Sequence, residues 1–149
     1  MRPVLAYAAL ASLLLGGCDR APAEPRVTVE QASVNLPALP GRPGAAYFIL
    51  RTNNDPTRLV SVTSPMVERI ELHESRVEGG VTTMGPARDL TFRSDGELRF
   101  ETGGRHAMLF GVDPALRPGA RIPLTFTFDP APAVTVDAEV RPPGDHGGH

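Results

Sequence analysis

The sequence predicts an all-β protein built from short antiparallel strands. Apolar and polar residues alternate in short segments, which is typical of strands that have one buried face. The chain of 149 residues also contains 16 prolines and 15 glycines, which interrupt it too often for a convincing helical period. Many short strands separated by turn residues are typical of a β-sandwich or a β-barrel.

The alternation is clearest towards the C-terminus. In residues 121–128, the even positions hold large apolar side chains, whereas the odd positions hold arginine, proline or threonine. Residues 134–140 repeat the pattern with valines and an alanine on one face. Turn pairs such as Asp95-Gly96 and Pro118-Gly119 separate the segments. The other predicted strands are residues 26–36, 45–51, 59–62, 67–76, 80–84, 97–101 and 106–112.

The N-terminus has the features of a bacterial export signal. Arg2 precedes an apolar stretch, residues 4–15, that is too short to span a bilayer comfortably. Small residues then lead to Cys18 in an arrangement that resembles the lipobox of bacterial lipoproteins, although an ordinary secretory signal with a chance cysteine is the alternative. We therefore expect residues 1–17 to be a signal peptide and Cys18 to carry a lipid that tethers a periplasmic protein to a membrane. Asp19 resembles a retention signal that favours the inner membrane.

The rest of the chain divides into three parts. Residues 18–25 are expected to form a flexible tether, because they contain too few apolar side chains to fold. Residues 26–142 are long enough for one compact domain with a modest core. Residues 143–149 are expected to form a flexible tail that contains two histidines, His146 and His149.

Composition excludes several classes of function. The formal net charge is −2, lysine is absent and the arginines are scattered, so we expect no nucleic-acid-binding surface. Cys18 is the single cysteine, and a lipid on its thiol leaves the folded domain without a disulfide, a thiol redox pair or a thiolate nucleophile. The missing thiols argue against a thiol reductase, and we expect a protein that is not an enzyme.

Two histidines and two methionines stand at spacings that predict a shared metal site. The candidate ligands are His73, Met84, His106 and Met108. A hairpin turn separates His73 from Met84; with residues 78–79 at its centre the two face each other directly, and with residues 79–80 they are diagonal neighbours. His106 and Met108 are two residues apart on one predicted strand and therefore project from the same face.

The ligand types favour copper(I). Thioether sulfur is soft and uncharged and imidazole is borderline, so the set suits Cu(I) better than zinc or oxygen-seeking cations. A blue-copper centre is not expected, because it needs a cysteine thiolate. Taken singly, each methionine is better explained by core packing, and His73 by a place on a strand surface. The four together favour a common site, whereas Met66 is assigned to the core or a loop.

The spacing His73-x10-Met84-x21-His106-x-Met108 resembles the signature of the periplasmic CuA copper chaperone family, often called PCuAC. Residues 103–109 (GGRHAML) resemble the Pro-Gly-Gly-x-His-x-Met-Leu segment of that family, with Thr102 in place of the proline. The resemblance covers roughly residues 26–140 and implies a cupredoxin-like β-sandwich that binds one Cu(I) through these four residues. It also implies delivery of copper towards the CuA centre of cytochrome c oxidase, directly or through a Sco-type copper protein.

Other functions remain open beside the chaperone. Copper storage or resistance is one alternative, although storage needs many sites and this chain offers one or two. A copper redox enzyme is a second and less favoured alternative. In the tail, Asp145, His146 and His149 supply nitrogen and oxygen donors that suit Cu(II), so this segment is either a weak auxiliary metal site or a chance polar tail.

Overall fold

A computed structural model describes Glu24 and residues 26–145 of the chain. The predicted signal peptide (residues 1–17), the predicted lipidation site Cys18, most of the predicted tether and the tail histidines His146 and His149 lie outside the described residues. The described residues form ten strands: β1 (Val27–Asn35), β2 (Gly44–Thr52), β3 (Thr57–Thr63), β4 (Val67–Glu78), β5 (Val81–Pro86), β6 (Thr91–Phe92), β7 (Leu98–Phe100), β8 (Arg105–Val112), β9 (Arg121–Asp129) and β10 (Val134–Arg141).

The prediction of an all-β protein is confirmed. Each of the predicted segments corresponds to one strand, and the ends differ by at most two residues. The additional strand is β6, whose two residues are too few to show any alternation in the sequence. Within the described part of the chain no helix is long and apolar enough to cross a membrane.

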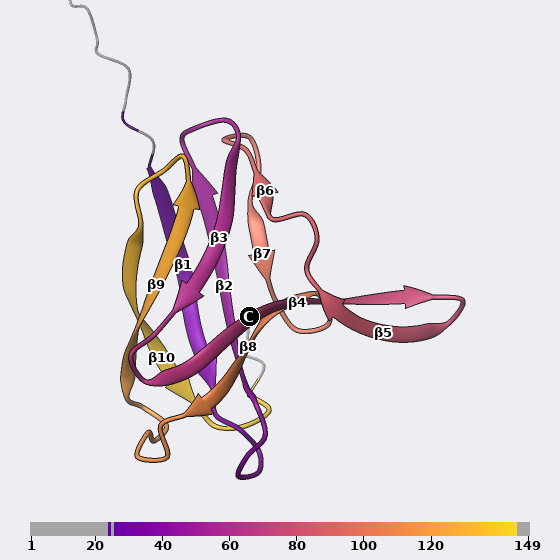
Figure 1. Ribbon diagram of the computed structural model, residues 1–149, viewed down its shortest axis with the longest axis vertical. Helices are drawn as coiled ribbons and strands as arrows, with labels where there is room; N and C mark the ends of the chain where they lie inside the picture. Colours follow the sequence, from indigo (N-terminus) through magenta and orange to yellow (C-terminus); the bar gives the residue numbers. More distant parts are fainter. Residues whose placement is uncertain (1–23, 25, 146–149) are drawn as a thin grey trace, which may run out of the picture.

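The strands form one hydrogen-bonded sheet that folds over on itself. Its order is β5-β4-β8-β7-β2-β1-β10-β9-β3-β6, with a further pairing between β8 and β2. In this order β1 and β10 separate β2 from β9, a distance of about 14 Å in a flat sheet. However, the rings of Phe48 on β2 and Phe126 on β9 meet edge to face, with centroids 4.8 Å apart. The two halves of the sheet therefore pack face to face as a β-sandwich, as predicted (Figure 1).

The core between the two layers is built from the alternating residues. Ile122, Leu124 and Phe126, the even positions of β9, are at most 1% exposed. On β8, Ala107 and Leu109 are fully buried in the same core. Because neighbouring residues of a strand point to opposite faces, His106 and Met108 on β8 must project outwards from the sandwich.

The hairpin of β4 and β5 extends beyond the body of the sandwich (Figure 1). β4 pairs with β8 from Val67 to Glu74 and with β5 from His73 to Glu78. Gly79 and Gly80 form the turn, with φ angles of 58° and 81°. Positive φ at both central positions is the requirement of a type I′ hairpin turn, which glycine meets without steric cost. Of the two turns considered above, the structure has the one centred on residues 79–80.

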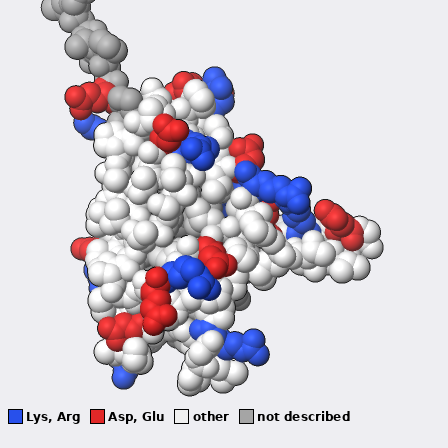
Figure 2. Space-filling model, viewed as in Figure 1, with Lys and Arg blue, Asp and Glu red and all other residues white. Residues whose placement is uncertain are grey.

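Charged side chains of both signs lie next to one another on the surface. Figure 2 shows acidic and basic groups side by side over this face instead of a field of one sign. Arg51 is paired with Glu97, and Arg58 with Asp129 at 3.5 Å. On this face the two signs of charge are therefore mixed instead of separated.

Candidate metal centre

The four candidate ligands lie on one face of three neighbouring strands, β5, β4 and β8. His73 on β4 stands directly opposite His106 on β8, and Glu71 stands opposite Met108. On the other side of β4, Met84 of β5 stands opposite Ser75. Residues that are directly opposite, or two apart on one strand, share a face. We call this surface, with His73, Met84, His106 and Met108, the His/Met face.

His73 is the centre of the His/Met face. It is the direct cross-strand neighbour of His106, and it is diagonal to both methionines. Direct neighbours have Cβ atoms about 4.5–5.5 Å apart and diagonal neighbours about 7–8 Å, which long side chains can span. A metal bound at His73 is thus within reach of the other three side chains, and the two methionines approach it from opposite sides.

The two imidazole rings are close enough to share a metal. Their centroids are 6.2 Å apart, with an angle of 50° between the ring planes. With imidazole–metal bonds of about 2 Å, and a ring nitrogen about 1.2 Å from the ring centre, two rings on one metal have centroids no more than about 6.4 Å apart. The observed separation lies within this limit, which applies to nitrogens on opposite sides of the metal; the smaller angle of a four-ligand site requires the two rings to move closer together.

Hydrogen bonds determine which ring nitrogens are available. Nε2 of His73 lies 3.1 Å from Oε2 of Glu71, and Nδ1 of His106 lies 3.2 Å from the carbonyl oxygen of Gly104. Carboxylate and carbonyl oxygens only accept, so each of these ring nitrogens carries the proton and donates it. In a neutral ring the lone pair then belongs to the other nitrogen, which is Nδ1 in His73 and Nε2 in His106. A metal-binding histidine usually donates its second N–H to a carboxylate or carbonyl in this way.

The Nδ1 atom of His73 also fits a metal ligand by its surroundings. It is buried, and it has no hydrogen-bond partner among the described residues. Leaving such a polar atom unsatisfied costs about 1–3 kcal/mol, which a bound metal ion offsets.

The donor set requires sulfur. In the described part of the chain, no group of three or more His, Cys, Asp and Glu side chains could hold a metal ion. The sulfur donors that share this face with His73 and His106 are the thioethers of Met84 and Met108. Two imidazoles and two thioethers suit Cu(I).

The four side chains differ in their exposure to solvent. Met84, on the projecting hairpin, is 59% exposed, whereas the side chain of His73 is 19% exposed. His106 and Met108 are half-buried. Met84 is therefore the outermost of the four candidate ligands. The tail histidines lie outside the described residues, so their position relative to this face is not described.

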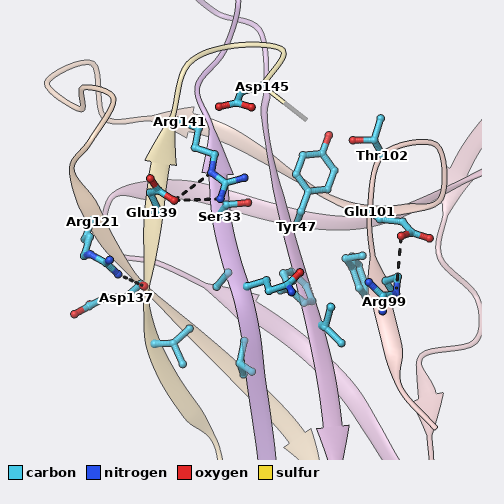
Figure 3. A pocket seen from close by; sticks show the side chains of 17 residues that line it. Ser33, Tyr47, Arg99, Glu101, Thr102, Arg121, Asp137, Glu139, Arg141 and Asp145 are labelled. Carbon is cyan, nitrogen blue, oxygen red and sulfur yellow. Dashed lines mark hydrogen bonds and ion pairs between the residues drawn. The ribbon is translucent and has the colours of Figure 1, made fainter. Parts of the chain in front are cut away.

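A separate groove crosses the outer face of β1, β2 and β10, with a volume of about 710 Å³ (Figure 3). None of the four candidate ligands lines it. Its charged side chains contact their own neighbours: Arg141 donates to Glu139 at 3.1 Å, and Arg99 lies 3.9 Å from Glu101. These groups do not converge on a common point, so the groove does not provide a second metal centre.

Several solved structures have the same fold as this chain. The apo PCuAC domain of PmoF1 is 20% identical, with a TM-score of 0.63 over 78% of this chain and 94% of that chain. The copper-bound PCuAC domain of PmoF2 is 22% identical, with a TM-score of 0.60 over 78% and 93%. The Cu(I) form of DR1885 from Deinococcus radiodurans is 26% identical, with a TM-score of 0.61 over 85% and 83%. The cupredoxin-like β-sandwich implied by the sequence resemblance is therefore confirmed.

Sequence comparison gives a relative and a family. An uncharacterized protein of Rickettsia prowazekii, RP573, is 33% identical over 88 residues, which cover 57% of this chain and 48% of that protein. The match thus spans about half the length of the curated relative. The model of a family described as LpqE-like lipoproteins matches residues 27–140, which include every described strand except the last residue of β10. The protein belongs to the LpqE-like family, and its fold is that of the PCuAC domains.

Proposed function

We propose that the protein is a copper metallochaperone of the periplasm, anchored to the inner membrane by a lipid on Cys18. It binds one Cu(I) through His73, Met84, His106 and Met108 and has no catalytic activity of its own. It delivers the metal towards the CuA centre of cytochrome c oxidase, directly or through a Sco-type copper protein. The observation that carries the proposal is the arrangement of all four residues on one face around His73.

The chemistry of the His/Met face suits a carrier. Two imidazoles and two thioethers are uncharged, so they hold a monovalent ion without the very tight binding that thiolates give. Thioethers also resist the disulfide formation to which thiols are prone outside the cytoplasm. Because Met84 is exposed on the hairpin, an acceptor protein can replace this ligand first without opening the core.

Similar proteins support copper as the cargo. The PCuAC domain of PmoF2 has been solved with copper, and DR1885 has been solved with Cu(I). Both share the fold of this chain, and DR1885 matches most of its length.

Competition titration with a chromophoric Cu(I) chelator tests the binding step. The full chain carries Cys18→Ser for this purpose, since a free thiol binds Cu(I) by itself. We expect one Cu(I) per chain, and loss of this binding in the double variant Met84→Leu/Met108→Leu. Met66→Leu makes the same chemical change away from the His/Met face and should bind as the parent does. Unaltered Cu(I) affinity in the double variant would contradict the proposed site, and several ions per chain would favour storage.

Transfer is tested separately. The Cu(I)-loaded chain is mixed with an apo CuA domain or with an apo Sco-type protein, and copper is measured on each protein after separation. Copper should move to one of them. If it stays on the loaded chain with both acceptors, delivery is excluded while Cu(I) binding stands.

The tail histidines form a second, weaker part of the proposal. We assign His146 and His149 to an auxiliary Cu(II) site. A chain that ends at Asp145 should then lose a weak Cu(II)-binding step and keep its Cu(I) affinity; equal Cu(II) binding by both chains would contradict the assignment.

A further inference from the structure

Glu71 links His73 to Arg69, which in turn packs on Phe110. One carboxylate oxygen, Oε2, accepts the hydrogen bond from Nε2 of His73 at 3.1 Å. The other, Oε1, lies 2.8 Å from Nε of Arg69. The guanidinium of Arg69 lies over the ring of Phe110, 4.5 Å from its centroid. The carboxylate is therefore held from both sides and does not turn freely.

The position of Glu71 follows from the strand geometry. Residues 69, 71 and 73 alternate onto the same face of β4 and stand opposite Phe110, Met108 and His106 of β8. Glu71 is directly opposite one candidate ligand and two residues from another. It belongs to the surroundings of the metal site without supplying a soft donor.

The hydrogen bond determines which ring nitrogen of His73 can bind a metal. With its proton on Nε2 and directed at Glu71, the ring offers Nδ1, the nitrogen nearer the backbone. In His106 the bond from Nδ1 to the carbonyl of Gly104 leaves Nε2, the nitrogen farther from the backbone. The two histidines thus present different nitrogens, although they stand directly opposite each other.

We propose that Glu71 is a positioning residue that fixes His73 to bind copper through Nδ1, whereas His106 binds through Nε2. This inference rests on the proposed function, because it concerns the same Cu(I) site. An Nδ1 ligand would hold the ion nearer the backbone of β4, and in the strand register the two diagonal methionines lie on either side of His73. With Nε2 as the ligand, the ion would stand farther from the strand and compete with the hydrogen bond to Glu71.

The test reads the ring nitrogens directly. The full chain carrying Cys18→Ser is labelled at the histidine ring nitrogens and loaded with Ag(I), a redox-inert probe of soft Cu(I) sites. Proton–nitrogen correlation spectra then identify which nitrogen bears hydrogen and which is coupled to silver. We expect silver coupling at Nδ1 of His73 and at Nε2 of His106, with hydrogen on the other nitrogen of each ring.

Three variants test the role of Glu71 through Cu(I) affinity. Glu71→Ala removes the acceptor, and loss of such a partner typically lowers metal affinity by about 10–100-fold. Glu71→Gln keeps an oxygen acceptor without the charge and should fall between Glu71→Ala and the parent. Glu78→Ala removes an exposed carboxylate from the hairpin end of the same strand and should leave the affinity unchanged.

The outcomes separate this inference from the proposed function. If the parent chain binds neither Ag(I) nor Cu(I), the proposed function fails. If the parent binds Ag(I) through Nε2 of His73, the function stands and the assignment to Nδ1 is wrong. Unchanged Cu(I) affinity and unchanged His73 nitrogen signals in Glu71→Ala would show that the glutamate does not position the ring.

Discussion

Three aromatic rings in mutual contact help to hold the two layers of the sandwich together, and removing the central one should have a large effect on stability. Phe48 is 1% exposed. Its ring stacks on Phe100 with a centroid distance of 4.4 Å and meets Phe126 edge to face at 4.8 Å. Truncating a buried phenylalanine to alanine costs about 3–5 kcal/mol. Within that sum, two aromatic pairs account for about 1–3 kcal/mol.

The expected loss is large compared with the stability of a domain of this size. Total unfolding free energies are about 5–15 kcal/mol, so Phe48→Ala should leave a folded but marginal protein. Phe48→Leu keeps most of the apolar volume and should lose mainly the ring pairs, about 1–3 kcal/mol. Because β2 also pairs with β8 through Ala45 and Met108, a loosened β2 weakens the support of the His/Met face.

Urea unfolding followed by far-ultraviolet circular dichroism measures these differences. Leu39→Ala is the control, since Leu39 is 62% exposed and its truncation should change the unfolding free energy by less than about 0.5 kcal/mol. A cost below about 2 kcal/mol for Phe48→Ala, with an unchanged urea dependence, would refute the idea that these rings join the layers.

Three further predictions concern the hairpin, a close backbone approach and an acidic loop. Gly80→Ala places a side chain at a φ of 81° and should destabilise the hairpin by about 1 kcal/mol. Amide hydrogen exchange in β5 should become faster, while the free energy of global unfolding should change little. Unchanged exchange in β5 would contradict this prediction. At Gly44, an added Cβ would lie 2.7 Å from the carbonyl oxygen of Asn35. Gly44→Ala should therefore lower the free energy of unfolding, measured by urea denaturation, by about 1–3 kcal/mol. Equal stability of the variant and the parent would show that the strands separate easily here. The backbone N–H and hydroxyl of Ser94 donate to Asp55 and, together with Arg93, hold the pKa of its carboxyl below the ordinary value. Because that folded pKa is lower than in the unfolded chain, its stabilisation is present above the unfolded pKa, near 3.9, and is lost as the pH falls through the folded pKa. The melting temperature of the parent should therefore exceed that of Asp55→Asn at neutral pH and approach it below about pH 4, whereas a constant difference would contradict this account.

The strands could be predicted from the sequence because each carries its own signal. The alternation in β9 places Ile122, Leu124 and Phe126 on the buried face whatever strand lies beside it. The order of the strands could not be predicted, because it depends on contacts between distant segments. The parallel pairing of β1 with β10 joins the two ends of the domain, and nothing within residues 27–35 indicates this partner. The strand pattern alone did not distinguish a sandwich from a barrel; the family resemblance implied the sandwich, and the contact of Phe48 with Phe126 confirms it.

The sequence predicted which residues form the candidate site and on which strands they lie, but not how the strands come together. His106 and Met108 share a face by the alternation of a strand, and a hairpin between His73 and Met84 follows from its glycines. The sequence allowed two turns, and the positive φ angles of Gly79 and Gly80 decide between them. The meeting of the hairpin with β8 was an assumption, since no residue within β4 specifies that His73 stands opposite His106.

Glu71 was missed, although the sequence contained a signal for it. It stands two residues before His73 on the same predicted strand, and the alternation that puts His106 and Met108 on one face puts Glu71 and His73 on one face too. The sequence could not tell whether the carboxylate turns towards the imidazole or towards solvent. Arg69 decides this in the structure, because it holds one carboxylate oxygen and leaves the other to His73.

The same register that assembles the His/Met face also makes it sensitive to sequence changes far from the ligands. In the described sheet β5 pairs with β4 alone, so the turn at Gly79 and Gly80 is the main constraint on where Met84 lies. A slip of one residue would move Met84 to the opposite face of the hairpin, away from His73. On β8, by contrast, His106 and Met108 are held between β4 and β2. The methionine that is easiest to displace is therefore the one on an edge strand, and the proposed carrier function requires a ligand that can be released in this way.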